Sequence, residues 1–343
     1  MNVMLTCAGR RNYLVRYFRE ALAGEGQVIA VDASMEAPAM AEADLAVRVP
    51  PVSEPDYTAV LLTVCEEYDI RLLVSLNDLE LPVLAAQRQR FLDRGTIPVV
   101  SEPNVIDTCF DKWKTADFLL DNGLQGPGTF SSLTDVRAAL RAGTLDFPLI
   151  AKFRWGTASL GIEVVEDLEE LELCRTLLMR RVTRTSLAAV SAGDPEHCVL
   201  IQQKLQGQEY GLDVVNDLHG QYVTTFVKRK LAMRAGETDR AETVDHPGLA
   251  DVGTRIGRAL RHIGNLDCDV FLTPDGPRVL EMNPRFGGGY PFSHVAGANL
   301  PAALLAWAEN RTPDTAWLQV EPGIRTAKCD RLVSVSRRTE ILA

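Results

Sequence analysis

Three oxygen-bearing side chains lie close together in the C-terminal third of this 343-residue sequence. Asp269 lies in a β-prone run, Asp275-Gly276 is a turn sequence, and Glu281 and Asn283 lie two residues apart in the run that follows. Side chains two residues apart on a strand point to the same face of a sheet, and an Asp-Gly pair favours a tight hairpin. The spacing therefore predicts Asp269, Glu281 and Asn283 on one face of a hairpin.

Oxygen ligands of this kind suit Mg²⁺, which proteins hold with one or two carboxylates while nucleotide phosphates complete the octahedron. Arg285 extends the same face and can place its guanidinium against a phosphoryl group during transfer. The plainer interpretation is a surface hairpin whose polar residues face water. The run of three glycines at 287–289 favours the functional interpretation.

A second candidate region combines a lysine with a loop of small residues. Lys152 lies in the β-prone run at 149–153, and the loop at 154–161 follows it. Backbone N–H groups in such a loop can approach phosphate oxygens, although the spacing is not that of a Walker loop. The alternatives are a lysine with a partly buried stem and an ordinary hairpin turn.

The stretch EMNPR at 281–285 matches the E-x-N-P-R signature of the ATP-grasp enzymes, and the chain resembles this family. It is particularly similar to the branch that contains the carbamoyl-phosphate synthetase large subunit and the pyrrolysine-biosynthesis ligase. The resemblance covers nearly the whole chain and implies a Rossmann-like preliminary domain, a helical joint and two lobes that clasp ATP. It implies that Asp269, Glu281 and Asn283 bind one or two Mg²⁺ ions, or Mn²⁺ in their place. Arg285 would then act in catalysis.

The resemblance also implies a set of nucleotide contacts. Lys112 matches the D-K-x-x-T motif that opens the helical joint, Lys152 matches the strand lysine, and Glu209 matches the acid that holds the ribose. Gln203 stands where many relatives have Glu, a change that should shift affinity because hinge contacts run largely through the backbone. The whole set is Lys112, Lys152, Gly156, Thr157, Ala158, Ser159, Gly161, Gln203, Lys204, Leu205 and Glu209.

Basic residues are concentrated at 228–234 of this acidic protein. A basic run on a pair of strands is usually a solvated face. In relatives, however, a cation at this point contacts phosphates or the acyl substrate, so Lys228 and Arg234 join Arg285 as catalytic candidates.

Periodicity predicts the elements that position these residues. Strands at 2–7, 27–31, 71–75 and 97–100 alternate with helices at 10–23, 57–68 and 79–92, which indicates a parallel sheet with flanking helices. Helices follow at 111–122 and 132–142. Strands then dominate, with late helices at 251–263 and 300–310. The later strands are expected at 149–153, 161–165, 199–205, 210–217, 221–231, 268–273 and 278–282.

The predicted fold class is therefore α/β followed by α+β. Residues 1–108 form a Rossmann-like preliminary domain, 109–205 a helical joint and the small ATP-grasp lobe, and 206–343 the C-terminal lobe with the metal site. Residues 180–197 lack a clean period and are expected to be a helix end that runs into a mobile loop.

Composition narrows the class of partner. The chain has 36 Lys and Arg against 46 Asp and Glu, a formal net charge of −10, which works against binding to nucleic acid or anionic membranes. Seven cysteines without CxxC spacing and five histidines without HxH or HExxH spacing indicate neither a zinc site nor a disulfide framework. No signal peptide or apolar span is evident, so we expect a cytoplasmic protein.

Two further features stay open. Residues 9–11, Gly-Arg-Arg, do not satisfy GxGxxG, which argues against NAD binding. The helix start there, with 77–78 nearby, could bind a substrate carboxylate or simply be exposed. His294 could touch substrate or merely pack.

The predicted activity is ATP-dependent ligation of a small carboxylic acid to an amine, both amino-acid-like, through an acyl phosphate with release of ADP and phosphate. A homodimer is common among relatives. One alternative is a bicarbonate-phosphorylating carboxylase or carbamoyl-phosphate-type synthetase, although the sequence lacks a second synthetase half, a glutaminase domain and a biotin-carboxylase tail. Another is a noncatalytic nucleotide-binding module, against which the intact set of Asp269, Glu281, Asn283 and Arg285 argues.

Overall fold

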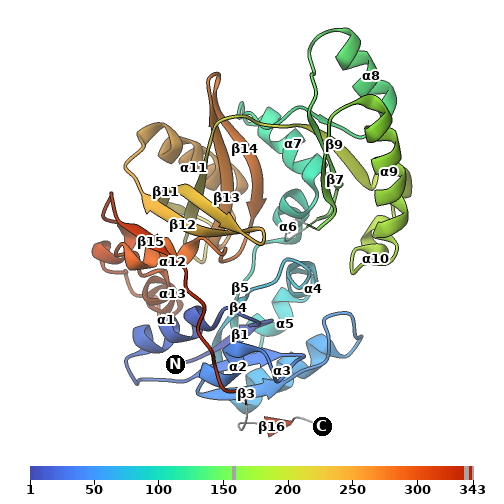
Figure 1. Ribbon diagram of the computed structural model, residues 1–343. Coiled ribbons are helices and arrows are strands. Elements are labelled where there is room, and N and C mark those ends of the chain that lie inside the picture. Colours follow the sequence, from blue (N-terminus) through green and yellow to red (C-terminus); the bar gives the residue numbers. More distant parts are fainter. Residues whose placement is uncertain (157–159, 336–339, 342–343) are drawn as a thin grey trace.

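The computed structural model describes residues 1–156, 160–335 and 340–341, and it contains three sheets (Figure 1). The first sheet has six parallel strands in the order β16-β3-β2-β1-β4-β5. Helices on both faces bury it, which explains the nearly continuous apolar runs of its central strands. Its strands are β1 (Asn2–Thr6), β2 (Val28–Asp32), β3 (Leu45–Arg48), β4 (Ile70–Ser75), β5 (Ile97–Val99) and β16 (Glu340–Ile341).

The helices of this region are α1 (Asn12–Leu22), α2 (Pro38–Glu42), α3 (Tyr57–Glu67), α4 (Leu81–Ala86) and α5 (Arg88–Leu92). The single helix expected at 79–92 is thus two helices, separated at Gln87, whose backbone leaves the helical region (φ −111°, ψ 7°). The predicted parallel sheet is confirmed. Strand β16 was not predicted, because its partner β3 is almost 300 residues away in the chain and no local pattern reports such a pairing.

A helical segment, α6 (Pro103–Phe110) and α7 (Lys112–Asp121), links the first sheet to the second. Asp111 separates the two helices: its backbone is extended and its side chain caps α7 by accepting a hydrogen bond from the Trp113 N–H. The second sheet, of order β6-β9-β7-β8, is antiparallel and packs against two helices. Its elements are β6 (Thr129–Phe130), α8 (Leu133–Arg141), β7 (Leu149–Phe153), β8 (Ile162–Val165), α9 (Leu168–Val182) and β9 (Val199–Gln203).

The expectation of an irregular mobile loop at 180–197 is wrong in part. Helix α9 ends at Val182, but the short helix α10 (Ala188–Ser191) and the 3₁₀ turn η1 (Pro195–His197) follow it. Leu187 is fully buried against the core of this lobe, which anchors the segment.

The third sheet is antiparallel, in the order β14-β13-β10-β11-β12-β15, and helix α11 (Pro247–Leu260) covers one face. Strand β13 begins at Gly264, four residues earlier than expected, and therefore contains Asp267. Strand β12 was not predicted. The strands are β10 (Gln208–Asn216), β11 (Tyr222–Arg234), β12 (Glu237–Thr243), β13 (Gly264–Thr273), β14 (Gly276–Asn283) and β15 (Arg325–Ala327).

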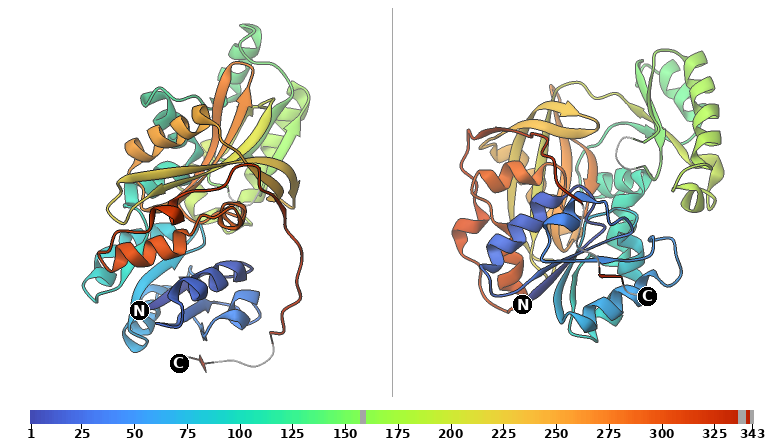
Figure 2. Two further views of the ribbon diagram at one scale, coloured as in Figure 1. Left: turned by 90° about the vertical axis from the view of Figure 1, so that its left-hand side faces the viewer. Right: turned by 60° about the horizontal axis from the view of Figure 1, so that its bottom comes forward.

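Helices α12 (Tyr290–Val295) and α13 (Leu300–Ala308), with the turn η2 (Thr315–Leu318), follow β14 and pack between the third sheet and α1. After β15 the chain returns to the edge of the first sheet, where β16 lies (Figure 2). The division at 108 and 205 stays a prediction. Within the described ranges, no helix is both long and apolar enough to cross a membrane.

Candidate active site

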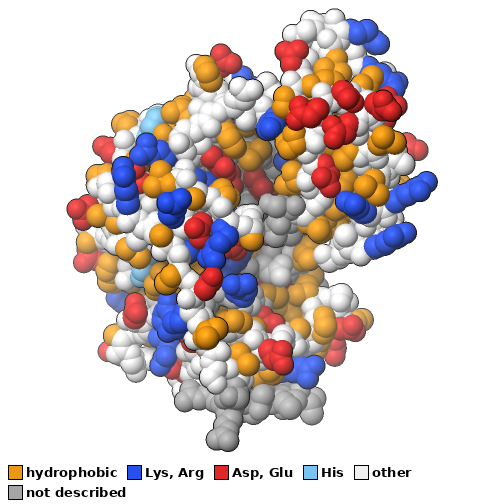
Figure 3. Space-filling model, in the orientation of Figure 1, with side chains coloured by type: hydrophobic (Ala, Val, Ile, Leu, Met, Phe, Trp, Pro, Cys, Tyr) orange, Lys and Arg blue, Asp and Glu red, His pale blue; other side chains and the backbone are white. Residues whose placement is uncertain are grey.

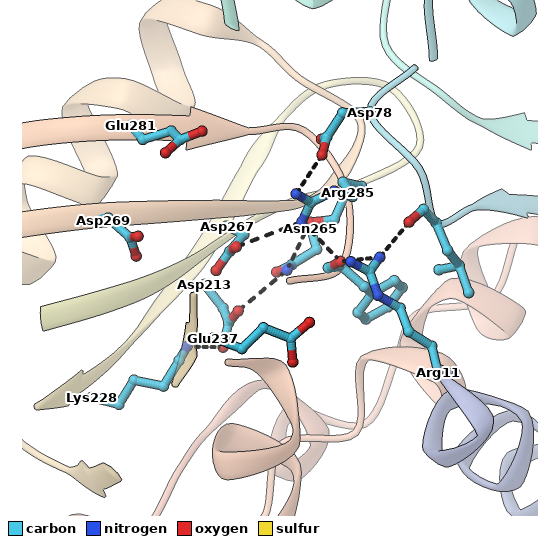
Figure 4. A network of polar contacts seen from close by, with 12 residues as sticks. Arg11, Asp78, Asp213, Lys228, Glu237, Asn265, Asp267, Asp269, Glu281 and Arg285 are labelled. Atoms are coloured by element: carbon cyan, nitrogen blue, oxygen red, sulfur yellow. Dashed lines mark hydrogen bonds and ion pairs between the residues drawn. The ribbon is translucent and has the colours of Figure 1, made fainter. Parts of the chain in front are cut away.

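The β13–β14 hairpin brings the three predicted metal ligands together. Asp269 lies directly opposite Glu281, and Asp267 lies directly opposite Asn283, so that all four side chains share one face. Figure 4 shows Asp267, Asp269 and Glu281 on the two strands. The turn closes between Thr273 and Gly276. The face therefore presents three carboxylates and one amide, all of them oxygen donors.

Asp267 is a site residue that the sequence analysis missed. It lies two residues before Asp269 on the same strand, and burial raises the pKa of its carboxyl group. The signal was present, because the run Leu-Asp-Cys-Asp-Val alternates acidic and apolar residues. It went unread because the strand was expected to start at Cys268.

The structure does not support a substrate contact for Lys228. Its side chain is fully buried, and its ammonium donates hydrogen bonds to Asp213 and, at 3.4 Å, to Ser293. Asp213 is also fully buried. An ammonium enclosed with its counter-ion in this way is not exposed to a ligand.

Lys230 takes the position in the site that Lys228 was expected to have. Its ammonium lies 2.7 Å from both Glu209 and Asp269, so it joins the predicted ribose acid to a predicted metal ligand. Those carboxylates raise the pKa of Lys230 above its ordinary value against the opposing effect of burial. A Cβ at Gly211 of β10 would lie 3.2 Å from the Lys228 side chain and 3.5 Å from that of Lys230, so the glycine leaves room for both lysines.

The ion pairs of Arg234 do not involve the predicted metal ligands. It ends β11 beside an exposed hairpin and pairs with Asp239 at 3.0 Å and Asp330 at 2.7 Å. The ion pair with Asp239 lies within the β11–β12 hairpin, and the ion pair with Asp330 joins this hairpin to the C-terminal segment. The expectation that Arg234 contacts phosphates or substrate therefore has no support from its position.

The two nucleotide lysines of the small lobe and the joint do converge on the hairpin. Lys112, in the first turn of α7, lies 3.6 Å from Glu281 and donates to the Gly156 carbonyl. Lys152 is almost fully buried, and burial, reinforced by the charge of Lys112, lowers its pKa to about 8. Two lysines that face carboxylates in this way suit a bound polyphosphate and its counter-ion.

Lys112 and Glu281 line a cleft between the small lobe and the rest of the molecule, which Figure 3 shows from outside. Its walls include Asp78, Lys112, Gly156, Glu281 and Asn283. The cleft thus brings together residues of β14, the linking helices α6 and α7, and the loops that follow β4 and β7.

The predicted phosphate loop is described only at its ends. Gly156 precedes the gap and Gly161 follows it, whereas Thr157, Ala158 and Ser159 lie outside the described residues. Gly161 has φ +66°, and a Cβ there would lie 2.3 Å from the Phe153 ring. Only glycine fits this turn, because its conformation is left-handed and the buried ring leaves no space.

A surface suited to a flat base lies beside these lysines and was also missed. Ile162 and Val164 of β8 are each 43% exposed, and they lie opposite Lys152 and Ile150 and hence on the same sheet face as them. The predicted hinge residues, Gln203, Lys204 and Leu205, connect this sheet to β10. Exposed apolar side chains next to a phosphate-binding lysine can stack a nucleobase.

The donor set fits a divalent cation. Among the described residues no three His, Cys, Asp or Glu side chains are grouped closely enough to hold a metal, and Lys230 and Lys112 lie against the carboxylates instead. Burial raises the pKa of Asp269 even with Lys230 beside it, and the charge of Asp267 adds to the rise. Burial disfavours the ionised form of these carboxylates, and a bound cation would stabilise that form.

The two open features have structural roles. Arg11 donates to the carbonyls of Leu76 and, at 3.1 Å, Phe286, so it joins the first region to the loop after β14. His294 stacks on Tyr17 with 3.6 Å between ring centroids, and burial lowers its pKa to about 4. Both side chains are thus engaged in packing between parts of the chain.

Comparisons with known proteins agree with this architecture. Residues 3–100 match the family model described as the N-terminal domain of PylC-like proteins, and residues 196–332 match one described as ATP-grasp in the biosynthetic pathway with Ter operon. Carnosine synthase 1 of Gallus gallus is 26% identical over 175 residues, which are 48% of this chain and 19% of that protein. The chain therefore spans far less than two thirds of that relative.

Solved structures share the fold. Biotin carboxylase of Campylobacter jejuni, in a complex with β,γ-ATP, superposes with a TM-score of 0.73 at 14% identity, covering 93% of this chain and 73% of that one. The L-amino acid ligase of Bacillus licheniformis gives 0.65 at 19% identity (93% and 77% covered). The N5-carboxyaminoimidazole synthetase of Staphylococcus aureus with ADP gives 0.65 at 13% (95% and 79%). The predicted fold class is confirmed.

Proposed function

We propose that this chain is a member of the ATP-grasp superfamily and an ATP-dependent carboxylate–amine ligase. One observation carries the proposal: Glu281 and Asn283 line the same cleft as Lys112 and Gly156, while Asp269 lies directly opposite Glu281. Oxygen ligands on one wall and cations on the other suit an Mg²⁺-bound triphosphate.

The roles follow from these positions. Asp269, Glu281 and Asn283 would hold one or two Mg²⁺ ions, which supply charge neutralisation for the phosphates when bound. Lys112, Lys152 and the loop at 156–161 would bind the phosphates. The hinge at 203–205 and Glu209 would hold the adenine edge and the ribose, and Lys230 would turn from Asp269 to the γ-phosphate.

The reaction we propose has two steps. An oxygen of the substrate carboxylate attacks the γ-phosphorus, the bond to the β,γ-bridging oxygen breaks, and ADP leaves with the electron pair. The amine nitrogen then attacks the acyl carbon, phosphate leaves and the nitrogen loses a proton. Arg285, nearly buried beside the cleft, would offset the negative charge of the first step.

We propose amino-acid-like acid and amine substrates. The support is the naming of two relatives, the L-amino acid ligase and carnosine synthase 1. Two structural relatives whose names refer to carboxylation favour a second candidate, phosphorylation of bicarbonate. We also infer a cytoplasmic location and a homodimer, which fractionation and light scattering would test.

Phosphate release in the presence of ATP and Mg²⁺ separates these candidates. We expect release to require a carboxylic acid, and mass measurement to show a condensed product once an amine is added. Release with bicarbonate alone would establish the second candidate. ATP binding without release under any of these conditions would contradict both.

Matched variants tie the activity to the hairpin. Glu281→Gln should abolish release, whereas Asp275→Asn, at the exposed tip of the same hairpin (side chain 81% exposed), should leave it unchanged. Full activity in Glu281→Gln would show that the site lies elsewhere.

A further inference from the structure

A loop from the region of the first sheet, residues 1–99, reaches the cleft between the small lobe and the third sheet. It connects β4 to α4, and its residue Asp78 lines the same cleft as Lys112, Glu281 and Asn283. The sequence motifs place the chemistry in the second and third sheets. A carboxylate from the first sheet at this point therefore needs its own explanation.

Asp78 holds the arginine of the signature stretch. Arg285 donates through Nη2 to Asp78 Oδ2 at 2.7 Å, and the two side chains are only 9% and 10% exposed (Figure 4). The other terminal nitrogen, Nη1, donates to the Phe286 carbonyl at 3.2 Å and lies 3.6 Å from Asp267. The guanidinium is thus held between two carboxylates, one from the first region and one from β13.

The charge of Arg285 is maintained by this arrangement. Burial by itself would lower the pKa of the guanidinium, but Asp78 and Asp267 raise it above its ordinary value. The Nε–H of Arg285 is buried and has no hydrogen-bond partner among the described residues. A permanent cation beside the cleft is a suitable group for an incoming phosphoryl oxygen.

The loop that carries Asp78 is rigid. The buried Glu80 accepts hydrogen bonds from Thr6 at 2.7 Å and Ser75 at 2.6 Å, and Tyr57 donates to its other oxygen. Asn77 accepts one from the Leu79 N–H at 2.9 Å. Asp78 lies between these anchored residues, and its orientation is therefore set before any ligand arrives.

A second arginine also joins the first sheet's region to the loop after β14, but this arginine belongs to the first region. Arg11 donates to the carbonyl of Leu76, at the start of this loop, and to that of Phe286, which follows Arg285. The Asp78–Arg285 contact and the Arg11–Phe286 contact together hold the β4–α4 loop against the end of β14. Movement of the first region would consequently move the guanidinium of Arg285.

We propose that Asp78 is a positioning residue that orients Arg285 toward the transferred phosphoryl group, a role that rests on the proposed phosphoryl transfer. Without the Asp78 carboxylate, the attraction of Asp267 dominates and turns the guanidinium toward β13. The first region thereby takes part in catalysis as well as in folding. A plain stabilising ion pair is the competing explanation, and it predicts a loss of folding stability instead of a loss of binding to the transferred phosphoryl group.

The test measures binding of ADP with Mg²⁺, alone and with aluminium fluoride, which mimics the phosphoryl group in transfer. This probe needs no knowledge of the acid or the amine. In the unmodified protein we expect aluminium fluoride to tighten ADP binding. Asp78→Asn should reduce that tightening factor about tenfold or more and leave the affinity for ADP alone unchanged. The control Glu54→Gln, an exposed carboxylate of the first region, should keep the full factor.

The decisive measurement is the energetic coupling between Asp78 and Arg285. Arg285→Lys should lose the tightening factor, and Asp78→Asn in that background should cause no further loss, because the two residues act as a unit. A full factor in Asp78→Asn, or losses that multiply in the double variant, would overturn the proposal. So would loss of affinity for ADP alone with an unchanged urea midpoint.

Two further outcomes are distinguishable. If the unmodified protein binds ADP but aluminium fluoride never tightens it, the proposed phosphoryl transfer itself fails and takes this inference with it. If Asp78→Asn does not fold, Asp78→Glu keeps the charge and shifts the carboxylate by one methylene. We then expect a partial loss of the factor, and a full factor would refute positioning by Asp78.

Discussion

Asp269 and Glu281 lie directly opposite each other on β13 and β14, and each carboxylate lies against a lysine from elsewhere in the chain. Lys230 of β11 is 2.7 Å from Asp269, and Lys112 of α7 is 3.6 Å from Glu281. The lysines thus balance the charge of the carboxylates without a ligand. We infer that binding of Mg²⁺ and ATP exchanges these partners, with the cation on the carboxylates and the lysines on the phosphates.

Loss of one of the opposed carboxylates should abolish turnover without unfolding the protein. Asp269→Asn should lower the rate of ADP formation by about 100-fold or more. Its free energy of unfolding should change by about 1 kcal/mol or less, because Lys230 keeps Glu209 as a partner. Phosphate release and urea titration measure the two effects. Removal of Mg²⁺ with EDTA should reproduce the loss of rate in the unmodified protein, and an EDTA-resistant rate would contradict the metal assignment.

Affinity for ATP should depend on pH through Lys152. Burial and the charge of Lys112 lower its pKa to about 8, so the free protein loses this positive charge as the pH rises from 7 to 9. Bound phosphates favour the protonated lysine, and the affinity should therefore fall above pH 8.

Two substitutions at this position check the assignment by calorimetry at pH 7 and pH 9. Lys152→Arg should remove the pH dependence, because a guanidinium stays charged over this range. Lys152→Met should bind weakly at both pH values. A dependence that persists in Lys152→Met would assign the titration to another group.

Lys228 should prove to be a stabilising residue. It and Asp213 form a buried ion pair, with side chains 1% and 0% exposed. Asp213→Asn leaves the ammonium without its counter-ion and should lower the free energy of unfolding by about 3–5 kcal/mol in urea. Replacing both together, with Lys228→Met and Asp213→Leu, should cost less. A Lys228→Met variant that is fully stable yet inactive would restore the catalytic role expected from the sequence.

Stability should fall in mild acid because of His262. The side chain is fully buried, donates from Nε2 to the Val214 carbonyl at 2.9 Å, and has its pKa lowered from 6.5 to about 4 by burial. Between those pH values the unfolded chain binds the proton and the native protein does not, so stability is lost as the pH falls. The contribution reaches about 1.4 kcal/mol per pH unit.

His294, whose pKa is also lowered to about 4, should contribute a similar slope. Urea titrations between pH 7 and pH 4 should therefore show a shallower dependence in His262→Gln, which keeps a donor for the Val214 carbonyl. His219→Gln, at an exposed position, should behave as the unmodified protein does. An unchanged slope in His262→Gln would mean that this histidine is protonated in the native state.

Much of the hairpin could be read from the sequence because its determinants are local. The two-residue period and the Asp-Gly turn place Glu281 and Asn283 on one face, and the same period was sufficient to find Asp267. Gly161 illustrates the same point, since its left-handed turn demands glycine. Signals of this kind act over a few residues and survive in any tertiary setting.

A charged residue in the sequence, by contrast, does not indicate which residue it will pair with. Lys228 and Lys230 have the same type and lie on the same strand, yet one is enclosed with Asp213 and the other bridges Glu209 and Asp269. Which of two such lysines meets the predicted metal ligands depends on neighbouring strands and on the helix that packs over one of them. The sequence therefore provides no means of choosing between Lys228 and Lys230, and the catalytic role of Lys228 stays a prediction that its buried position does not support.

The amino-acid sequence by itself determined most of the elements, their order and the hairpin face, because each depends on short-range periodicity and turn chemistry. The likeness to the ATP-grasp signature came from the residues at 281–285. Only the tertiary structure decided that Asp78 meets Arg285, that Arg11 reaches Phe286 and that β16 returns to β3. Such contacts join residues more than 200 positions apart. They form because burial of apolar faces brings whole regions together, and polar groups then pair with whatever lies across the boundary.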